Sequence, residues 1–137
     1  MSVVTELLQS ENDGTISFGD YTREQKGKRE DFEHGGDVYK VKTYDEITKL
    51  ERNGLFVYES VPGSTVTHFL EKENGVSFQL ESSQDVQITL ELAESTEYEI
   101  FVDGEQVGLV ETNRSGKLSF SVELEKGAPV QVKVVER

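Results

Sequence analysis

The second half of the chain alternates between apolar and polar residues. Over 76–81, for example, Val76, Phe78 and Leu80 are apolar while Ser77, Gln79 and Glu81 are polar. A period of two residues is typical of a β-strand with one buried face. The same alternation predicts four more strands, over 86–92, 98–102, 118–124 and 130–134.

Turn residues separate these predicted strands. Asp103-Gly104 suits a two-residue hairpin, and Asn113–Gly116 and Lys126–Pro129 suit tight loops. Short strands with frequent turns are typical of antiparallel sandwiches or barrels. We therefore predict a mostly β fold: one antiparallel β-sandwich, or a jelly-roll-like variant, over 1–137, with 61–137 as its regular part.

The first 60 residues are less regular and predict further strands with one short α-helix near residues 43–53. Thr43 and Glu46 have the spacing of a capping box, and Gly54 follows as a stop signal. The charged segment 20–37 predicts an exposed loop or ribbon anchored by Phe32.

The two histidines are predicted to lie in different kinds of structure. His68 lies in register with Val66 and Leu70, which predicts a partly buried strand residue. His34 is predicted to lie on a loop.

Charge and composition narrow the range of partners. The chain carries 27 acidic and 14 basic side chains, a net charge of -13. This excess repels phosphate backbones, so we expect neither a nucleic acid nor a membrane as a partner. The N-terminal residues lack the pattern of a secretory signal, which predicts a cytoplasmic protein, or a virion component released by lysis.

The sequence contains few of the residues and motifs that a catalytic site would need. The chain has no cysteine and only two histidines, His34 and His68, and neither lies in a nucleophile motif. An enzyme would need two close carboxylates in a pocket, or a contact between His68 and a serine or carboxylate. We therefore expect a protein that is not an enzyme and needs no cofactor.

One segment has a composition suited to a cation. Asp31, Glu33 and Asp37 flank the pair Gly35-Gly36, and carboxylate oxygens are the ligands that calcium prefers. The alternative is a charged turn in which the glycines permit a positive φ.

Tyrosines offer a second candidate site. Sugars bind to exposed aromatic faces, and with no tryptophan in the chain that role falls to tyrosine. We select Tyr39, Tyr44 and Tyr58 as candidate residues for a glycan-binding module. The alternative is that these rings lie in the core.

The leading hypothesis is a non-enzymatic structural or interaction protein, a homo-oligomer or a binder of another protein. A sandwich leaves edge strands that another chain can extend. The apolar residues Val3, Val4, Leu7 and Leu8 near the N-terminus are the candidates for self-association. A virion accessory protein remains an alternative.

Two resemblances add to this interpretation. Residues 98–108 and 112–120 resemble the closing hairpins of small bacterial immunoglobulin-like and transthyretin-like domains, which implies a sandwich. The stretches 14–19, 41–51 and 58–63 resemble short acidic bacterial proteins of unknown function, some of which carry an endosialidase label. Sialidases resemble propellers with tryptophan-ended aspartate boxes and an arginine triad. Because the chain has no tryptophan, no catalytic residue is carried over.

Overall fold

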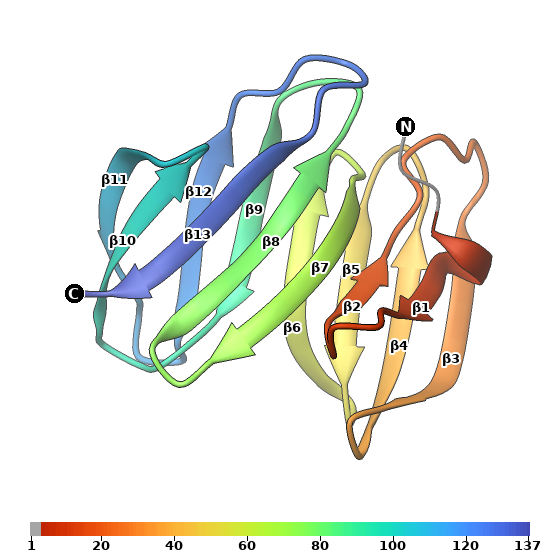
Figure 1. Cartoon of the computed structure of the whole chain (residues 1–137), viewed down its shortest axis with the longest axis horizontal. Coiled ribbons are helices and arrows are strands. Elements are labelled where there is room, and N and C mark those ends of the chain that lie inside the picture. The colour runs from red at the N-terminus through yellow and green to blue at the C-terminus, as the bar shows by residue number, and fades with distance from the viewer. Residues whose placement is uncertain (1–3) are drawn as a thin grey trace.

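The computed structural model describes residues 4–137 and consists of two antiparallel sheets packed face to face. Strands make up 62% of the chain and helix 2%, and the sheets do not close into a barrel. In Figure 1 the seven-stranded sheet faces the viewer and the six-stranded sheet lies behind it. The predicted mostly β sandwich is confirmed.

Hydrogen bonding sets the order of strands in each sheet. The seven-stranded sheet runs β1 (Leu8–Ser10), β2 (Ile16–Phe18), β7 (Thr65–Lys72), β8 (Gly75–Glu81), β13 (Val130–Glu136), β10 (Glu97–Val102) and β11 (Glu105–Glu111). The six-stranded sheet runs β12 (Lys117–Val122), β9 (Val86–Glu91), β6 (Leu55–Val61), β5 (Thr48–Arg52), β4 (Asp37–Thr43) and β3 (Gly27–His34). A single 3₁₀ turn, η1 (Thr5–Leu7), precedes β1.

Aromatic rings from both sheets meet in the core. Tyr58 of β6 is fully buried, and its ring contacts Phe18 edge-on at 5.2 Å between centroids. Phe78 of β8 contacts the same tyrosine at 5.8 Å. Each fully buried ring stabilises the fold by about 2 kcal/mol. The inward positions of most strands join this one cluster, which ties the sheets together.

The hairpin predicted at Asp103-Gly104 is present. Both residues have positive φ angles, 50° and 84°, as a type I′ turn requires. The turn joins β10 to β11, and Asp103 also accepts a hydrogen bond from the backbone of Gln131.

The α-helix predicted near residues 43–53 is wrong, because this segment forms a turn followed by β5. The Thr43 hydroxyl contacts Thr48 Oγ1 at 2.8 Å and accepts from the Asp20 amide, so it does not cap a helix. Asn53 and Gly54 both have positive φ and form the β5–β6 hairpin turn. Gly54 therefore serves a hairpin and not a helix end.

The charged segment 20–37 includes the strand β3 and the turn into β4, so the ribbon alternative is the correct one there. Phe32 is half-buried and packs against the core, as the anchor was predicted to do.

Tyr21, which precedes β3, is buried and donates a 2.7 Å hydrogen bond to the buried carboxylate of Glu81.

His68 is exposed, so the prediction of a partly buried position is wrong. The register between β7 and β8 shifts between Thr67 and Leu70, and His68 has a φ of 54° at this bulge. A bulge turns the following side chains relative to a regular strand. His68 therefore leaves the inward alternation that Val66 begins.

Candidate functional site: the open end of the sandwich

At one end of the sandwich, contacts between the sheets protect the edge strands β1 and β3. The Arg29 guanidinium of β3 donates to the Leu8 carbonyl at 3.3 Å and pairs with the Glu6 carboxylate at 3.2 Å. The strand β1 has three residues, and β3 is interrupted by a bulge where Asp31 has a positive φ. Short, charged and bulged edges resist pairing with other chains. We call this the closed end.

At the opposite end, which we call the open end, each sheet finishes in a strand of six or more residues. These edge strands are β11, with seven residues, and β12, with six. In the described chain, each of them pairs with a strand on one side only. The chain also ends here, because β13 finishes beside β10 (Figure 1).

The strand β12 is a regular edge. Leu118 and Phe120 point into the core, while Ser119 and Ser121 are exposed between and after them. Its pairing with β9 contains no bulge. Its one charged residue, Lys117, is held by Glu91 at 2.6 Å and lies 4.2 Å above the Phe56 ring. This strand therefore has few of the features that discourage further pairing.

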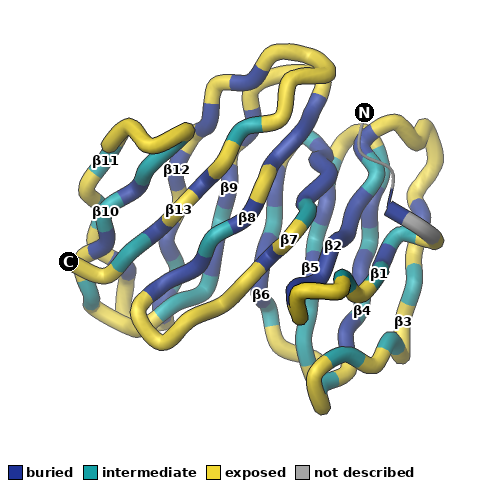
Figure 2. Tube along the Cα trace, in the orientation of Figure 1, coloured by how far each residue is buried: buried dark blue, intermediate teal, exposed yellow. Residues whose placement is uncertain are grey.

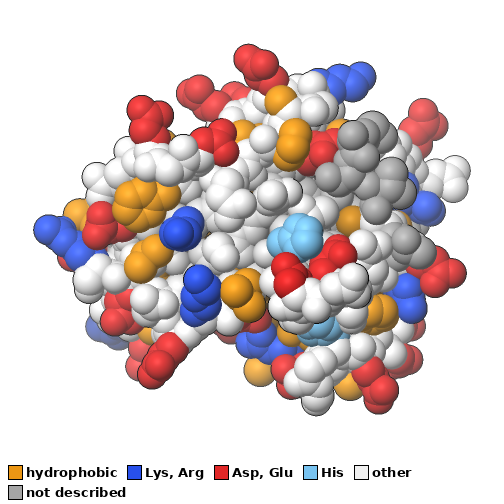
Figure 3. All heavy atoms as spheres, in the orientation of Figure 1, with side chains coloured by type: hydrophobic (Ala, Val, Ile, Leu, Met, Phe, Trp, Pro, Cys, Tyr) orange, Lys and Arg blue, Asp and Glu red, His pale blue; other side chains and the backbone are white. Residues whose placement is uncertain are grey.

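The strand β11 exposes apolar side chains at its free edge. Val107 is 57% exposed and Leu109 is 46% exposed, whereas Val110 packs partly against the core. Figure 2 shows β11 as exposed along most of its length, and Figure 3 shows hydrophobic side chains gathered on this side of the seven-stranded sheet. Exposed apolar side chains on an unpaired strand are typical of a protein contact.

The three candidate tyrosines do not form a sugar platform. Tyr39 and Tyr58 are buried, and the Tyr58 hydroxyl contacts Ser64 Oγ at 2.8 Å inside the core. Burial raises the pKa of both phenols. Tyr44 is half-buried, with the Lys26 ammonium 5.9 Å above its ring. A stacking site needs exposed ring faces, and two of these three rings offer none.

The three candidate calcium ligands are not brought together. Among the residues that the structure describes, no group of three or more acidic or histidine side chains is arranged to hold a metal ion. Asp31 lies at the β3 bulge, and Asp37 accepts a hydrogen bond from Asn53 Nδ2 at 2.9 Å. Glu33 lies in β3, opposite Val38. This segment matches the alternative of a charged turn with glycines at positive φ.

The apolar N-terminal residues pack on the chain's own core. Leu8 is 1% exposed in β1, Val4 is 7% exposed, and Leu7 is half-buried against the core cluster. Val3 lies outside the described residues. Val4 and Leu8 therefore do not form the predicted self-association surface, because buried side chains offer no surface to a second chain.

Both histidines contact the β1–β2 hairpin. The His34 ring contacts Ser10 Oγ at 2.7 Å, and His68 Nδ1 lies 3.1 Å from Asp13 Oδ2. The contact between His68 and a carboxylate, which we required of an enzyme, is therefore present. The hydroxyl and the backbone amide of Thr15 both donate to Asp13, and these hydrogen bonds lower the pKa of that carboxyl. The Thr15 hydroxyl also lies 3.2 Å from His68 Nδ1, so these contacts anchor the β1–β2 hairpin to β7.

The sequence interpretation missed β11, the strand with the most exposed apolar residues of the open end. Its alternation is broken by Gly108 and by a bulge where Val107 has no directly opposite residue. The hairpin signal at Asp103-Gly104 was available, and a hairpin requires a second strand after its turn. That requirement would have placed a strand over 105–111.

We compared the chain with known proteins, and no family model, curated protein or solved structure matches it. Within residues 4–137 no helix has the length and apolarity needed to cross a membrane.

Proposed function

We propose that this is a non-enzymatic structural protein that associates with a second copy of itself through the open end. The observation that carries the proposal is that β11 and β12, the unpaired edges of the two sheets, lie at the same end of the sandwich. A second copy related by a two-fold axis extends both sheets at once. Each copy brings both of its free edge strands to the contact, so two strand pairings form together.

Charge favours pairing β11 with β12 of the second copy. The strand β11 begins at Glu105 and ends at Glu111, so pairing it with itself in antiparallel register places like charges opposite each other. The only charge within β12 is Lys117. The mixed pairing avoids the repulsion and covers Val107 and Leu109, which are otherwise exposed to water.

Absolute mass by light scattering after size exclusion tests the proposal. We expect a dimer at concentrations of some tens of micromolar, and a monomer for Leu109→Lys, because the substitution replaces apolar surface at the contact with a strongly hydrated charge. Leu55→Lys is the matched control: Leu55 is 68% exposed, but its strand β6 is paired on both sides. A wild-type monomer at all concentrations would contradict the proposed function.

Disulfide trapping tests the pairing mode separately. The chain has no cysteine, so single substitutions report one position each. Leu109 lies opposite the outward residue Glu99, and Ser119 is exposed on the outer face of β12. We expect Leu109→Cys mixed with Ser119→Cys to form a crosslinked heterodimer faster than either variant crosslinks to itself. Faster self-crosslinking of Leu109→Cys would overturn the mixed pairing but leave self-association standing.

A further inference from the structure

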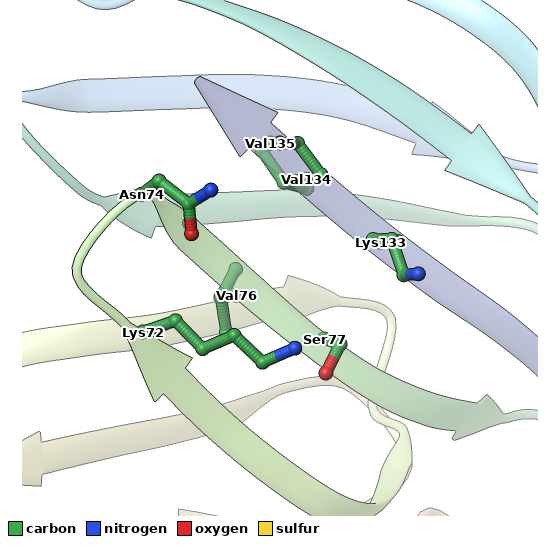
Figure 4. A pocket seen from close by; sticks show the side chains of 8 residues that line it. Lys72, Asn74, Val76, Ser77, Lys133, Val134 and Val135 are labelled. Atoms are coloured by element: carbon green, nitrogen blue, oxygen red, sulfur yellow. The ribbon is translucent and has the colours of Figure 1, made fainter.

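The outer face of the seven-stranded sheet is hollowed between β8 and β13. The hollow has a volume of about 220 Å³ and lies beside the β7–β8 turn. Figure 4 shows its lining from close by. The lining residues are Lys72, Asn74, Gly75, Val76, Ser77, Lys133, Val134 and Val135.

Gly75 is one of the residues that line the hollow. On the outer face it lies between Val135 of β13 and Lys72 of β7, its directly opposite residues. A Cβ at this position would overlap the Val134 carbonyl oxygen, so the close approach of the two strands requires glycine. The next residue on the same face is Ser77, which is also small. Gly75 thus lets β8 approach β13 closely, and neither Gly75 nor Ser77 carries a large side chain that would cover the hollow.

Four polar side chains line the hollow and have no partner among the described residues. The ammonium groups of Lys72 and Lys133, the Ser77 hydroxyl and the Asn74 amide make no hydrogen bond or ion pair within the described residues. Lys133 lies directly opposite Ser77, and Figure 4 shows Lys72 reaching toward the same serine. Lys72, Lys133 and Ser77 thus lie on three neighbouring strand positions, while Figure 4 shows Asn74 at the other end of the hollow.

The lining contains no carboxylate, although acidic residues outnumber basic ones by 27 to 14 in the chain. The lysine cluster on the six-stranded sheet differs in this respect. There Lys40, Lys42 and Lys49 line a depression of about 30 Å³ that also contains Glu51, whose carboxylate lies 3.8 Å from the Lys49 ammonium. The hollow at Gly75 is thus larger and lacks an internal counter-charge.

We propose that the hollow at Gly75 binds a small phosphate-type oxyanion, as inorganic phosphate or as the phosphate group of a small metabolite. Lysine ammonium groups bind phosphate as point charges, and a hydroxyl such as that of Ser77 donates to a further phosphate oxygen. The site is open to solvent, so the expected dissociation constant lies in the range of about 1 mM. This inference is independent of association through the open end.

Titration with sodium phosphate, followed by amide NMR shifts at constant ionic strength set with sodium chloride, tests the proposal. We expect saturable shifts at residues 72–77 and 133–135. Glycerol phosphate is the second arm: equal affinity indicates a phosphate group carried by a metabolite, and weaker binding indicates free phosphate.

Paired variants separate a site from the general effect of charge. We expect Lys72→Gln with Lys133→Gln to weaken binding about tenfold or more, which corresponds to about 1.4 kcal/mol. Lys40→Gln with Lys126→Gln makes the same change in net charge at distant positions and should leave the affinity within about twofold. Equal weakening in both pairs, shifts that do not saturate, or shifts outside the hollow would identify an adventitious ion only and overturn the proposal.

Discussion

Gly75 and Gly108 lie in the same sheet but differ in what surrounds the missing side chain. A Cβ at Gly75 would overlap the Val134 carbonyl, whereas at Gly108 it would meet Ile100 Cδ1 at an ordinary contact distance of 3.9 Å. We expect Gly75→Ala to lower the free energy of unfolding by about 2 kcal/mol or more, because neighbouring backbone must shift. Gly108→Ala should be neutral or stabilising by up to about 1 kcal/mol. Urea unfolding measures both, and equal costs would contradict the crowding argument.

Tyr21 gives the protein a pH-dependent contribution to stability. Burial, together with the hydrogen bond to Glu81, raises the pKa of this phenol from 10 to about 12. Because the pKa is higher in the folded state, the contribution is complete below pH 10 and is lost as the pH rises through 12.

The variant Tyr21→Phe isolates this contribution from those of the other tyrosines. We expect the free energy of unfolding to fall more steeply in the wild type than in Tyr21→Phe between pH 10 and pH 12. Urea unfolding followed by far-UV circular dichroism measures the difference. Parallel pH profiles for the two proteins would show that Tyr21 titrates normally in the folded state.

At the scale of elements, the two ends of the sandwich differ in how their edge strands are held. At the closed end Arg29 joins β3 to β1 and to Glu6, which supports a strand of only three residues. At the open end β11 and β12 rely on one neighbouring strand each. The closed end therefore has a side-chain contact between its two edge strands in addition to the pairing of each strand within its sheet.

We expect Arg29→Gln to speed hydrogen exchange at the amides of β1 by about tenfold, while β9 exchanges as before. The reason is that loss of the guanidinium removes contacts worth about 1–2 kcal/mol, which promotes local opening. Arg114→Gln is the control, because Arg114 lies exposed in the β11–β12 loop. Unchanged exchange in β1 would mean that its packing alone holds the closed end.

At the scale of the whole molecule, the net charge of -13 opposes association of like copies. Salt screens this repulsion, since the Debye length falls from about 30 Å at 0.01 M to about 3 Å at 1 M. We therefore expect the fraction of dimer to increase from about 20 mM to about 500 mM sodium chloride, and Leu109→Lys to remain monomeric throughout. Light scattering measures both, and dissociation by salt would indicate an interface held by opposite charges.

The sequence by itself determined the fold class and most of the strands of the second half. Alternation such as that of Val76, Phe78 and Leu80 reports a half-buried strand directly, because side chains on a strand point to opposite faces in turn. The turn at Asp103-Gly104 was equally local, since only residues that tolerate positive φ suit it. These features depend on neighbours in the chain and need no knowledge of distant contacts.

The tertiary structure alone decided which strands are edges and which side chains are exposed. Thr43 and Glu46 fit a helix locally, but Thr43 bonds Thr48 and the Asp20 amide, and the buried Leu50 joins the core of a sheet. Tyr58 is buried, and Leu109 is exposed, because of strands that lie far away in sequence. Burial depends on the packing of both sheets, so a local pattern could not locate the open end or the hollow at Gly75.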